Sequence, residues 1–285
     1  MKRYLSLSID WESFGNYTPV HYKDGIDYFE SISEQIIQYA KEIMDGKMTW
    51  YCKVDFYADI TYYNRFPELA DMILRNGGEL GTHIHHISAD PVQRAKVYRW
   101  AAERMKRVGY PVRAYSAGMG EIYNSDAKAL LDAGYNVSRW SFAHLCHHMC
   151  NWENADMFPG YVNLEHYKRN DAADGLFCYP LGGDARNNQE PKGNYQLHVN
   201  EQIPLDRLKE ITETSFENEE KLGKMPLLGA FFHTYDLCEN PYPTSRILPC
   251  VIEKWEAYIR WLTDNDVILV TDSEAKRIYD TEFKK

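Results

Sequence analysis

An excess of basic charge, long apolar runs and a dense cysteine framework are all lacking in this sequence of 285 residues. Lys and Arg number 32 against 42 Asp and Glu, which gives a formal net charge of −10. Because nucleic-acid binding draws its affinity from clustered Lys and Arg, this balance argues against a nucleic-acid partner. No run approaches the ~18 apolar residues of a membrane-spanning helix, so we expect no membrane span.

The first residues and the distribution of cysteines indicate in which cellular compartment the protein is expected. Met1-Lys2-Arg3 leads directly into an expected strand at 4–9, which leaves no room for the apolar stretch of a signal peptide. The six cysteines are scattered along the chain, unlike a secreted disulfide framework, and we expect mostly reduced thiols. The sequence therefore predicts a cytoplasmic protein.

Length and composition indicate one large hydrophobic core. Hydrophobic residues make up 44% and charged residues 26% of the chain, as is ordinary for a globular protein. α/β barrels reach this length as single domains, and no linker or repeat divides the sequence. We expect one domain over residues 1–285. Within it, residues 141–200 are rich in Gly, Asn, Asp and Pro and should form elaborated loops on the substrate side.

Segments with helical spacing of apolar residues alternate with short apolar segments along the chain. The spacing predicts helices over 28–44, 66–75, 91–108, 127–133, 204–221 and 249–265, with a last one after a capping box at 271–274. Strands are predicted over 4–9, 48–54, from 79 onward, 112–117, 137–140, 227–232 and 267–270, with short ones near 160–162, 176–179 and 196–199. This alternation predicts an α/β fold with a parallel sheet, closed or nearly closed as a barrel.

Polar residues follow several of these strands. Asp10 and Glu12 end the first strand, and because positions i and i+2 of a strand share a face, both can face one pocket. His83, His85 and His86 follow another strand, and neighbouring imidazoles commonly share a divalent metal ion with a carboxylate. Either motif alone would be better explained as a helix cap or a solvated surface cluster. Their joint occurrence at strand ends favours a site.

Arg113 and His233 are further strand-associated polar residues. In a parallel barrel the strand ends converge on one rim, so both could join the same site. Arg113 would otherwise belong to a buried ion pair, and His233 could be a core histidine bonded to Asp236. A second cluster matches no zinc-finger spacing and reads as a loop or helix near the rim; it contains His144, Cys146, His147, His148 and Cys150.

These ordered motifs resemble the polysaccharide deacetylase superfamily of carbohydrate esterases over nearly the whole chain. Its members carry an acidic first motif, a Gly-x-His motif, an Arg motif and a late Leu/Phe-x-His motif. The matching stretches here are Ile9–Glu12, Glu79–His83, Val112–Ala114 and Phe231–His233. The resemblance implies a distorted (β/α) barrel of the polysaccharide deacetylase type.

Two positions depart from the family pattern. The usual second histidine lies four residues after the first, where this chain has Ile87, so His85 or His86 would have to replace it. The adjacent aspartate pair of common members is also absent, and Glu12 stands two residues after Asp10.

The resemblance implies a role for each motif residue. Asp10 would be the general base, Arg113 would orient it, and His233 would be the general acid. The metal ligands would be Glu12, His83 and either His85 or His86, holding a divalent ion, zinc in the first place, with cobalt, nickel or iron as alternatives. Aromatic rings suit stacking on sugars, and the aromatic residues expected to contact substrate are Trp11, Tyr115, Tyr179 and Tyr235.

The sequence thus predicts a metal-dependent hydrolase that removes an N-acetyl or similar acyl group from a carbohydrate, in glycan biosynthesis. Two alternatives stay open. One is hydrolysis of another non-peptide C–N bond, such as a formamide or cyclic amide. The other is a non-catalytic sugar-binding protein on a deacetylase scaffold, which Ile87 and the missing aspartate pair favour.

Overall fold

Parallel strands form a closed barrel in the computed structural model, which describes residues 1–12, 23–55, 59–85, 88–142, 146–147, 150–183, 196–200, 202–238 and 247–284. The strand order is β10-β1-β2-β3-β4-β5-β9, and β9 pairs with β10 to close the ring. These strands are β1 (Arg3–Trp11), β2 (Thr49–Lys53), β3 (Glu79–Ile84), β4 (Ala114–Ala117), β5 (Val137–Phe142), β9 (Phe177–Leu181) and β10 (Leu227–His233). The predicted (β/α) barrel is therefore confirmed.

The remaining strands lie outside this ring. They are β6 (Cys146–His147), β7 (Cys150–Asn151), β8 (Gly160–Tyr161) and β11 (Val267–Leu269). β11 runs parallel to the start of β1, β8 is antiparallel to β9, and β6 pairs with β7. The prediction of a strand over 196–199 was wrong, because this segment makes only isolated bridges, one of them to β10.

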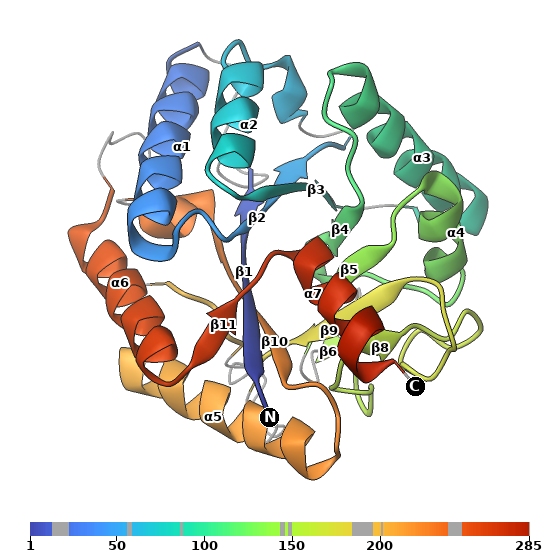
Figure 1. Ribbon diagram of the computed structural model, residues 1–285. Coiled ribbons are helices and arrows are strands. Elements are labelled where there is room, and N and C mark those ends of the chain that lie inside the picture. Colours follow the sequence, from blue (N-terminus) through green and yellow to red (C-terminus); the bar gives the residue numbers. More distant parts are fainter. Residues whose placement is uncertain are drawn as a thin grey trace.

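Helices surround the strands, as Figure 1 shows, in the order that the apolar spacing predicts. They are α1 (Lys23–Met44), α2 (Phe66–Arg75), α3 (Pro91–Arg107), α4 (Asp126–Ala133), α5 (Leu205–Lys221), α6 (Pro249–Asp264) and α7 (Asp272–Ile278). On α1 the predicted apolar stripe is buried at Phe29, Ile32 and Ile36. Gly134 ends α4 in the left-handed conformation, at φ 99°, where a side chain would add strain.

The amino-terminal end of the barrel is closed by Asp272, the first residue of α7. This fully buried carboxylate accepts hydrogen bonds from Ser6 Oγ at 2.7 Å and Thr49 Oγ1 at 3.0 Å. It also accepts bonds from the hydroxyls of Tyr51 and Tyr179, the latter at 2.6 Å. In Figure 1, α7 accordingly lies across the strands rather than in the outer ring of helices.

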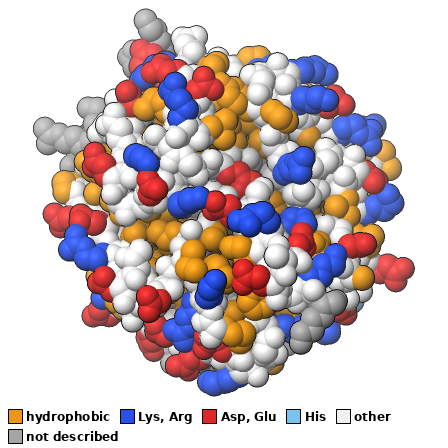
Figure 2. Space-filling view, in the orientation of Figure 1, with side chains coloured by type: hydrophobic (Ala, Val, Ile, Leu, Met, Phe, Trp, Pro, Cys, Tyr) orange, Lys and Arg blue, Asp and Glu red, His pale blue; other side chains and the backbone are white. Residues whose placement is uncertain are grey.

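The charges of the outer surface are mixed. On the face drawn in Figure 2, Lys and Arg side chains alternate with Asp and Glu rather than gathering into one patch. None of the helices in the described ranges has the length and apolar character that crossing a membrane requires.

Candidate active site

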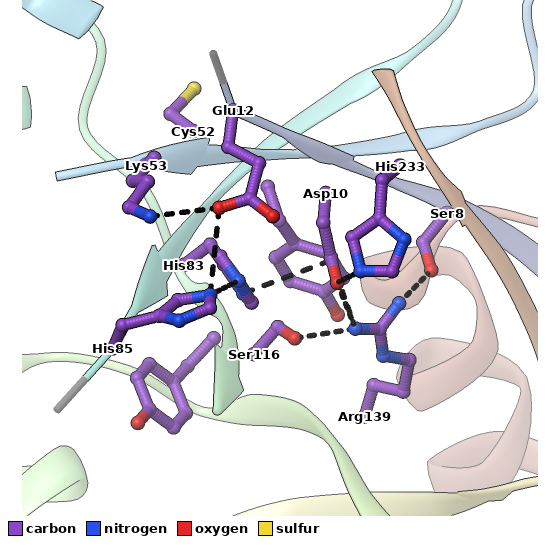
Figure 3. A network of polar contacts seen from close by, with 12 residues as sticks. Ser8, Asp10, Glu12, Cys52, Lys53, His83, His85, Ser116, Arg139 and His233 are labelled. Carbon is purple, nitrogen blue, oxygen red and sulfur yellow. Dashed lines mark hydrogen bonds and ion pairs between the residues drawn. The ribbon is translucent and has the colours of Figure 1, made fainter. Parts of the chain in front are cut away.

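The carboxyl ends of neighbouring barrel strands bring a polar cluster together inside the barrel (Figure 3). The strand register places Asp10 of β1 beside His233 of β10, and Lys53 of β2 beside His83 of β3. Ser116 of β4 follows in register with His83, and Arg139 of β5 is in register with Ser116; the cluster therefore draws on strands around most of the ring. Such convergence at the carboxyl ends is where parallel barrels carry their chemistry.

Asp10 is fixed by a buried arginine. Arg139 Nη2 donates to both carboxylate oxygens of Asp10, at 2.9 and 3.0 Å, and the two residues are 1% and 3% exposed. Arg139 also donates to Ser8 Oγ and Ser116 Oγ, each at 2.7 Å. Because the guanidinium is planar and held at several points, it fixes the orientation of the Asp10 carboxylate.

Arg113, the predicted partner of Asp10, is not in the site. It is exposed and precedes Ala114, the first residue of β4, so it lies at the amino end of the barrel, whereas Asp10 lies near the carboxyl end of its strand. Arg139 makes the contact expected of Arg113. The signal for Arg139 was present in the sequence, because it lies inside the predicted strand 137–140, and a charged residue that such a strand buries must find a partner.

Glu12, His83 and His85 form the candidate metal centre. Each offers one ligand atom, and these atoms lie within 4.8 Å of one another. The Nε2 atoms of the two histidines are 2.6 Å apart, and His85 Nε2 lies 3.5 Å from Glu12 Oε2. His86, the alternative to His85, lies outside the described residues, so the structure supports His85 for this place without testing His86.

The charge states of these donors suit a metal ion. Burial, together with the cations Lys53 and Arg139, lowers the pKa of His83 well below its usual value, and neutral imidazole is the form that binds metal. Burial raises the pKa of Glu12, while the ammonium of Lys53 acts in the opposite direction. Lys53 Nζ donates to Glu12 Oε2 at 2.9 Å, with both side chains 2% exposed. A metal ion at Glu12 would therefore share that carboxylate with a buried ammonium.

His85 is held against a glycine. A Cβ atom at Gly118, in the short helix Gly118–Gly120, would lie 2.3 Å from Cδ2 of His85 and 2.5 Å from its Cγ. The backbone N–H of His85 donates to Asp55 Oδ2 at 3.0 Å, which fixes the other side of the residue. The imidazole therefore has little room to move aside.

Gly118→Ala is expected to weaken zinc binding by about tenfold or more, because the added methyl group displaces the His85 ring, and loss of ligand support typically costs this much. Competition with a chromophoric chelator measures the affinity. Thermal unfolding of the metal-free variant is the control, because it measures how far the same close contact lowers stability without zinc. An unchanged zinc affinity would show that His85 is not a ligand.

His233 lies on the other side of Asp10. Its Nε2 atom is 3.7 Å from Asp10 Oδ2, and its Nδ1 atom is 2.8 Å from Asp236 Oδ2. Burial alone would lower the pKa of His233, but Asp236 and the carboxylates of Asp10 and Glu12 outweigh it and raise the pKa to about 9. The ring thus carries a proton on each nitrogen at neutral pH, and the one on Nε2 points towards Asp10.

No family model and no curated protein matches the sequence. Its solved neighbours share the fold. A crystal structure described as a "putative polysaccharide deacetylase" from Mycobacterium smegmatis aligns with a TM-score of 0.63 at 14% identity, over 97% of this chain and 89% of that one.

Two carbohydrate-active enzymes align as well. The 4-alpha-glucanotransferase of Thermococcus litoralis gives a TM-score of 0.55 at 13% identity, over 99% of this chain and 41% of that one. The alpha-amylase AmyC of Thermotoga maritima gives 0.53 at 10% identity, over 97% and 75%. At such identities the likeness establishes the barrel fold, and the activity has to be argued from the site.

Three of the aromatic residues predicted to bind substrate are buried in the protein interior. Trp11 is 1% exposed, packs on Phe29 and Phe66, and donates its indole N–H to Ser33 Oγ at 2.8 Å. Tyr115 is fully buried, with its ring 5.3 Å from that of Tyr98 and 5.7 Å from that of Tyr135. Tyr179 is the partner of Asp272 at the far end of the barrel. These rings have no face for a sugar, so this prediction is corrected for all three.

Tyr235 remains a candidate for substrate contact. It belongs to the short helix η4 (Thr234–Leu237) and is only partly buried. Its ring stacks on that of His233, with 4.5 Å between centroids. The second histidine and cysteine cluster is untested, because His144 and His148 lie outside the described residues and only the backbone is described for Cys146, His147 and Cys150.

Proposed function

We propose that this protein is a metal-dependent hydrolase that removes an N-acetyl or similar acyl group from a carbohydrate. The observation that carries the proposal is the position of Asp10, which Arg139 orients and which lies between the Glu12, His83 and His85 donors and the protonated His233. The carbohydrate class is proposed because the structural neighbours are described as carbohydrate-active enzymes.

The two oxygens of Asp10 face different partners. Oδ1 lies 3.8 Å from His83 Nδ1, and Oδ2 lies 3.7 Å from His233 Nε2. A carboxylate placed between a metal ligand and a protonated imidazole can exchange protons with a reacting group that lies between them. This arrangement suits hydrolysis, which needs a base at the attacking water and an acid at the leaving group.

The donor set fits a divalent transition metal, since it combines one carboxylate with two imidazoles. An ion held by Glu12, His83 and His85 would polarise the acyl carbonyl and acidify water at neutral pH. Asp10 accepts the proton of the attacking water, and Arg139 keeps the carboxylate turned towards it. His233 then donates its Nε2 proton to the nitrogen of the departing sugar amine. Asp236 stabilises the positive charge of His233 until that transfer.

The buried pair of Lys53 and Glu12 favours a second candidate. Glu12 is already neutralised by an ammonium at 2.9 Å, so this carboxylate is satisfied without a metal ion. With Lys53 in the place of the ion, the barrel can bind sugar hydroxyls but lacks the metal that polarises an amide carbonyl. The second candidate is therefore a sugar-binding protein.

His83→Ala separates the two candidates. Protein purified without chelator is expected to contain about one equivalent of a transition metal, and the variant is expected to lose both the metal and the release of acetate from N-acetylated sugars. His166→Ala changes an exposed histidine and serves as the matched control. Glycan binding by the wild type, with no metal even after reconstitution, would establish the sugar-binding candidate instead.

A further inference from the structure

The segment 196–200 brings a second histidine to His233. Val199 N donates to the carbonyl of Phe231 at 2.8 Å, so the segment runs beside β10, and the His198 ring stacks on Phe231 with centroids 4.4 Å apart. Lys254 of α6 anchors its end by donating to the carbonyl of Asn200 at 2.6 Å. His198 is thereby held beside His233, with 5.1 Å between the ring centroids.

The orientation of the Asn200 side chain follows from its backbone neighbours. The N–H groups of Gln202 and Ile203 both donate to Asn200 Oδ1, at 3.0 and 3.1 Å. The amide nitrogen of Asn200 must then be the atom 3.0 Å from His198 Nδ1. Because an amide nitrogen only donates, His198 Nδ1 accepts this bond and carries no proton.

The unprotonated Nδ1 of His198 determines the direction of the hydrogen bonds to Asp236. A neutral His198 has its proton on Nε2 and donates it to Asp236 Oδ2, at 2.5 Å. The same oxygen accepts from His233 Nδ1 at 2.8 Å and from the backbone N–H of His233 at 2.6 Å. Burial would raise the pKa of Asp236, but the bonds from His198 and His233 outweigh it and lower the pKa.

We infer that Asn200 and His198 are positioning residues, which act through Asp236 to hold His233 with its Nε2 proton directed at Asp10. The inference rests on the proposed function for the use of that proton, and the bond directions stand on their own. Asn200 fixes the tautomer of His198, His198 completes the bonds of Asp236, and Asp236 fixes the ring of His233. Neither Asn200 nor His198 needs to touch substrate.

The directions of these hydrogen bonds also show whether His198, His233 and Asp236 could bind a metal ion. His198, His233 and Asp236 lie close enough to hold an ion, with ligand atoms within 4.8 Å. A metal at His198 Nε2 would require the proton to move to Nδ1. There it would meet the NH₂ group of Asn200, which cannot accept it. The cluster therefore serves as a hydrogen-bonded support and not as a metal site.

Asn200→Asp is the sharpest test, because it places a carboxylate of nearly the same shape against His198 Nδ1. His198 should then take up a second proton, and its positive charge should compete for Asp236. The titratable groups that face His233 are Asp236 of η4, Asp10 of β1, Glu12 directly after β1, His83 of β3 and His198, and the ring of Tyr235 stacks on it. In the variant, position 200 gains a negative charge and His198, which shares Asp236 with His233, gains a positive one. The pH at the midpoint of the His233 titration is expected to fall by about one unit.

Nitrogen-15 NMR spectra of labelled histidine side chains report the protonation of His198 and His233 without any substrate. In the metal-free wild type at pH 7, His198 should be neutral with its proton on Nε2, and His233 should be protonated on both nitrogens. In Asn200→Asp, His198 should be cationic and the titration of His233 should move downward. His166→Gln assigns an exposed histidine and should leave both signals unchanged.

Three results would overturn the inference: a wild-type His198 with its proton on Nδ1, a His233 midpoint that Asn200→Asp does not move, or a shift of His198 to the Nδ1-protonated form on addition of zinc. Failure of the hydrolase proposal would look different. The spectra would then agree with the inference, while the wild type releases no acetate from N-acetylated sugars.

Discussion

Arg139→Met is expected to lower kcat/KM by about a thousandfold, because Asp10 loses the group that orients it, and general-base catalysis contributes about that much. The variant also leaves a carboxylate that is 3% exposed without its cation. Removing one partner of a buried pair costs about 3–5 kcal/mol of stability. Steady-state kinetics on an N-acetylated sugar from which the wild type releases acetate, together with urea unfolding, measure both effects.

Two matched variants make this prediction specific. Arg113→Met removes an exposed arginine at the other end of the barrel and should leave activity and stability close to wild type. Arg139→Lys keeps the charge but loses the planar fork, so it should fall between wild type and the methionine variant. If Arg139→Met and Arg113→Met behave alike, Arg139 does not orient the base.

Lys53→Met is expected to make the buried Glu12 carboxylate depend on a bound metal ion, because the variant removes the ammonium that neutralises it. Without metal, Glu12 is left buried and unneutralised, and the free energy of unfolding should fall by about 3 kcal/mol or more. With zinc present the loss should be reversed, because the ion no longer shares Glu12 with an ammonium and no longer meets its repulsion. Zinc affinity should rise about tenfold or more.

Thermal unfolding with and without zinc, together with calorimetric titration, tests this expectation. Lys128→Met is the control, since its ion pair with Asp132 on α4 is 67% and 54% exposed and contributes little. A Lys53→Met protein that zinc neither binds nor stabilises would refute a metal centre at Glu12. The sugar-binding candidate would then be the better account.

The fold followed from the sequence because helix and strand periodicities are local. The apolar stripe of α1 and the capping box of α7 at Thr271 are patterns within a few residues, and both appear in the structure as predicted. The segment around 176–179 was predicted only as a short strand in a loop region. It is in fact β9, which closes the barrel against β10, a pairing that no local pattern indicates.

Part of the site was also predicted, because several of its residues belong to local sequence motifs. Asp10, Glu12, His83, His85 and His233 end strands in recognisable motifs, and the structure brings them together. Lys53 and Arg139 lie within or at the end of strands that were predicted, yet their side chains point into the barrel only because of the strand register. Burial of the aromatic residues depends likewise on which face of a strand meets the core.

The position of Asp272 has a consequence for how the chain acquires its structure. Ser6 and Asp272 are separated by 266 positions, and the hydroxyls of Thr49, Tyr51 and Tyr179 share the same carboxylate. During synthesis from the N-terminus these four hydroxyl groups have no such partner until α7 leaves the ribosome. The barrel interior can therefore be sealed only after residues 1–272 have been made. Such distant contacts also make folding slow, since the intervening chain must be ordered first.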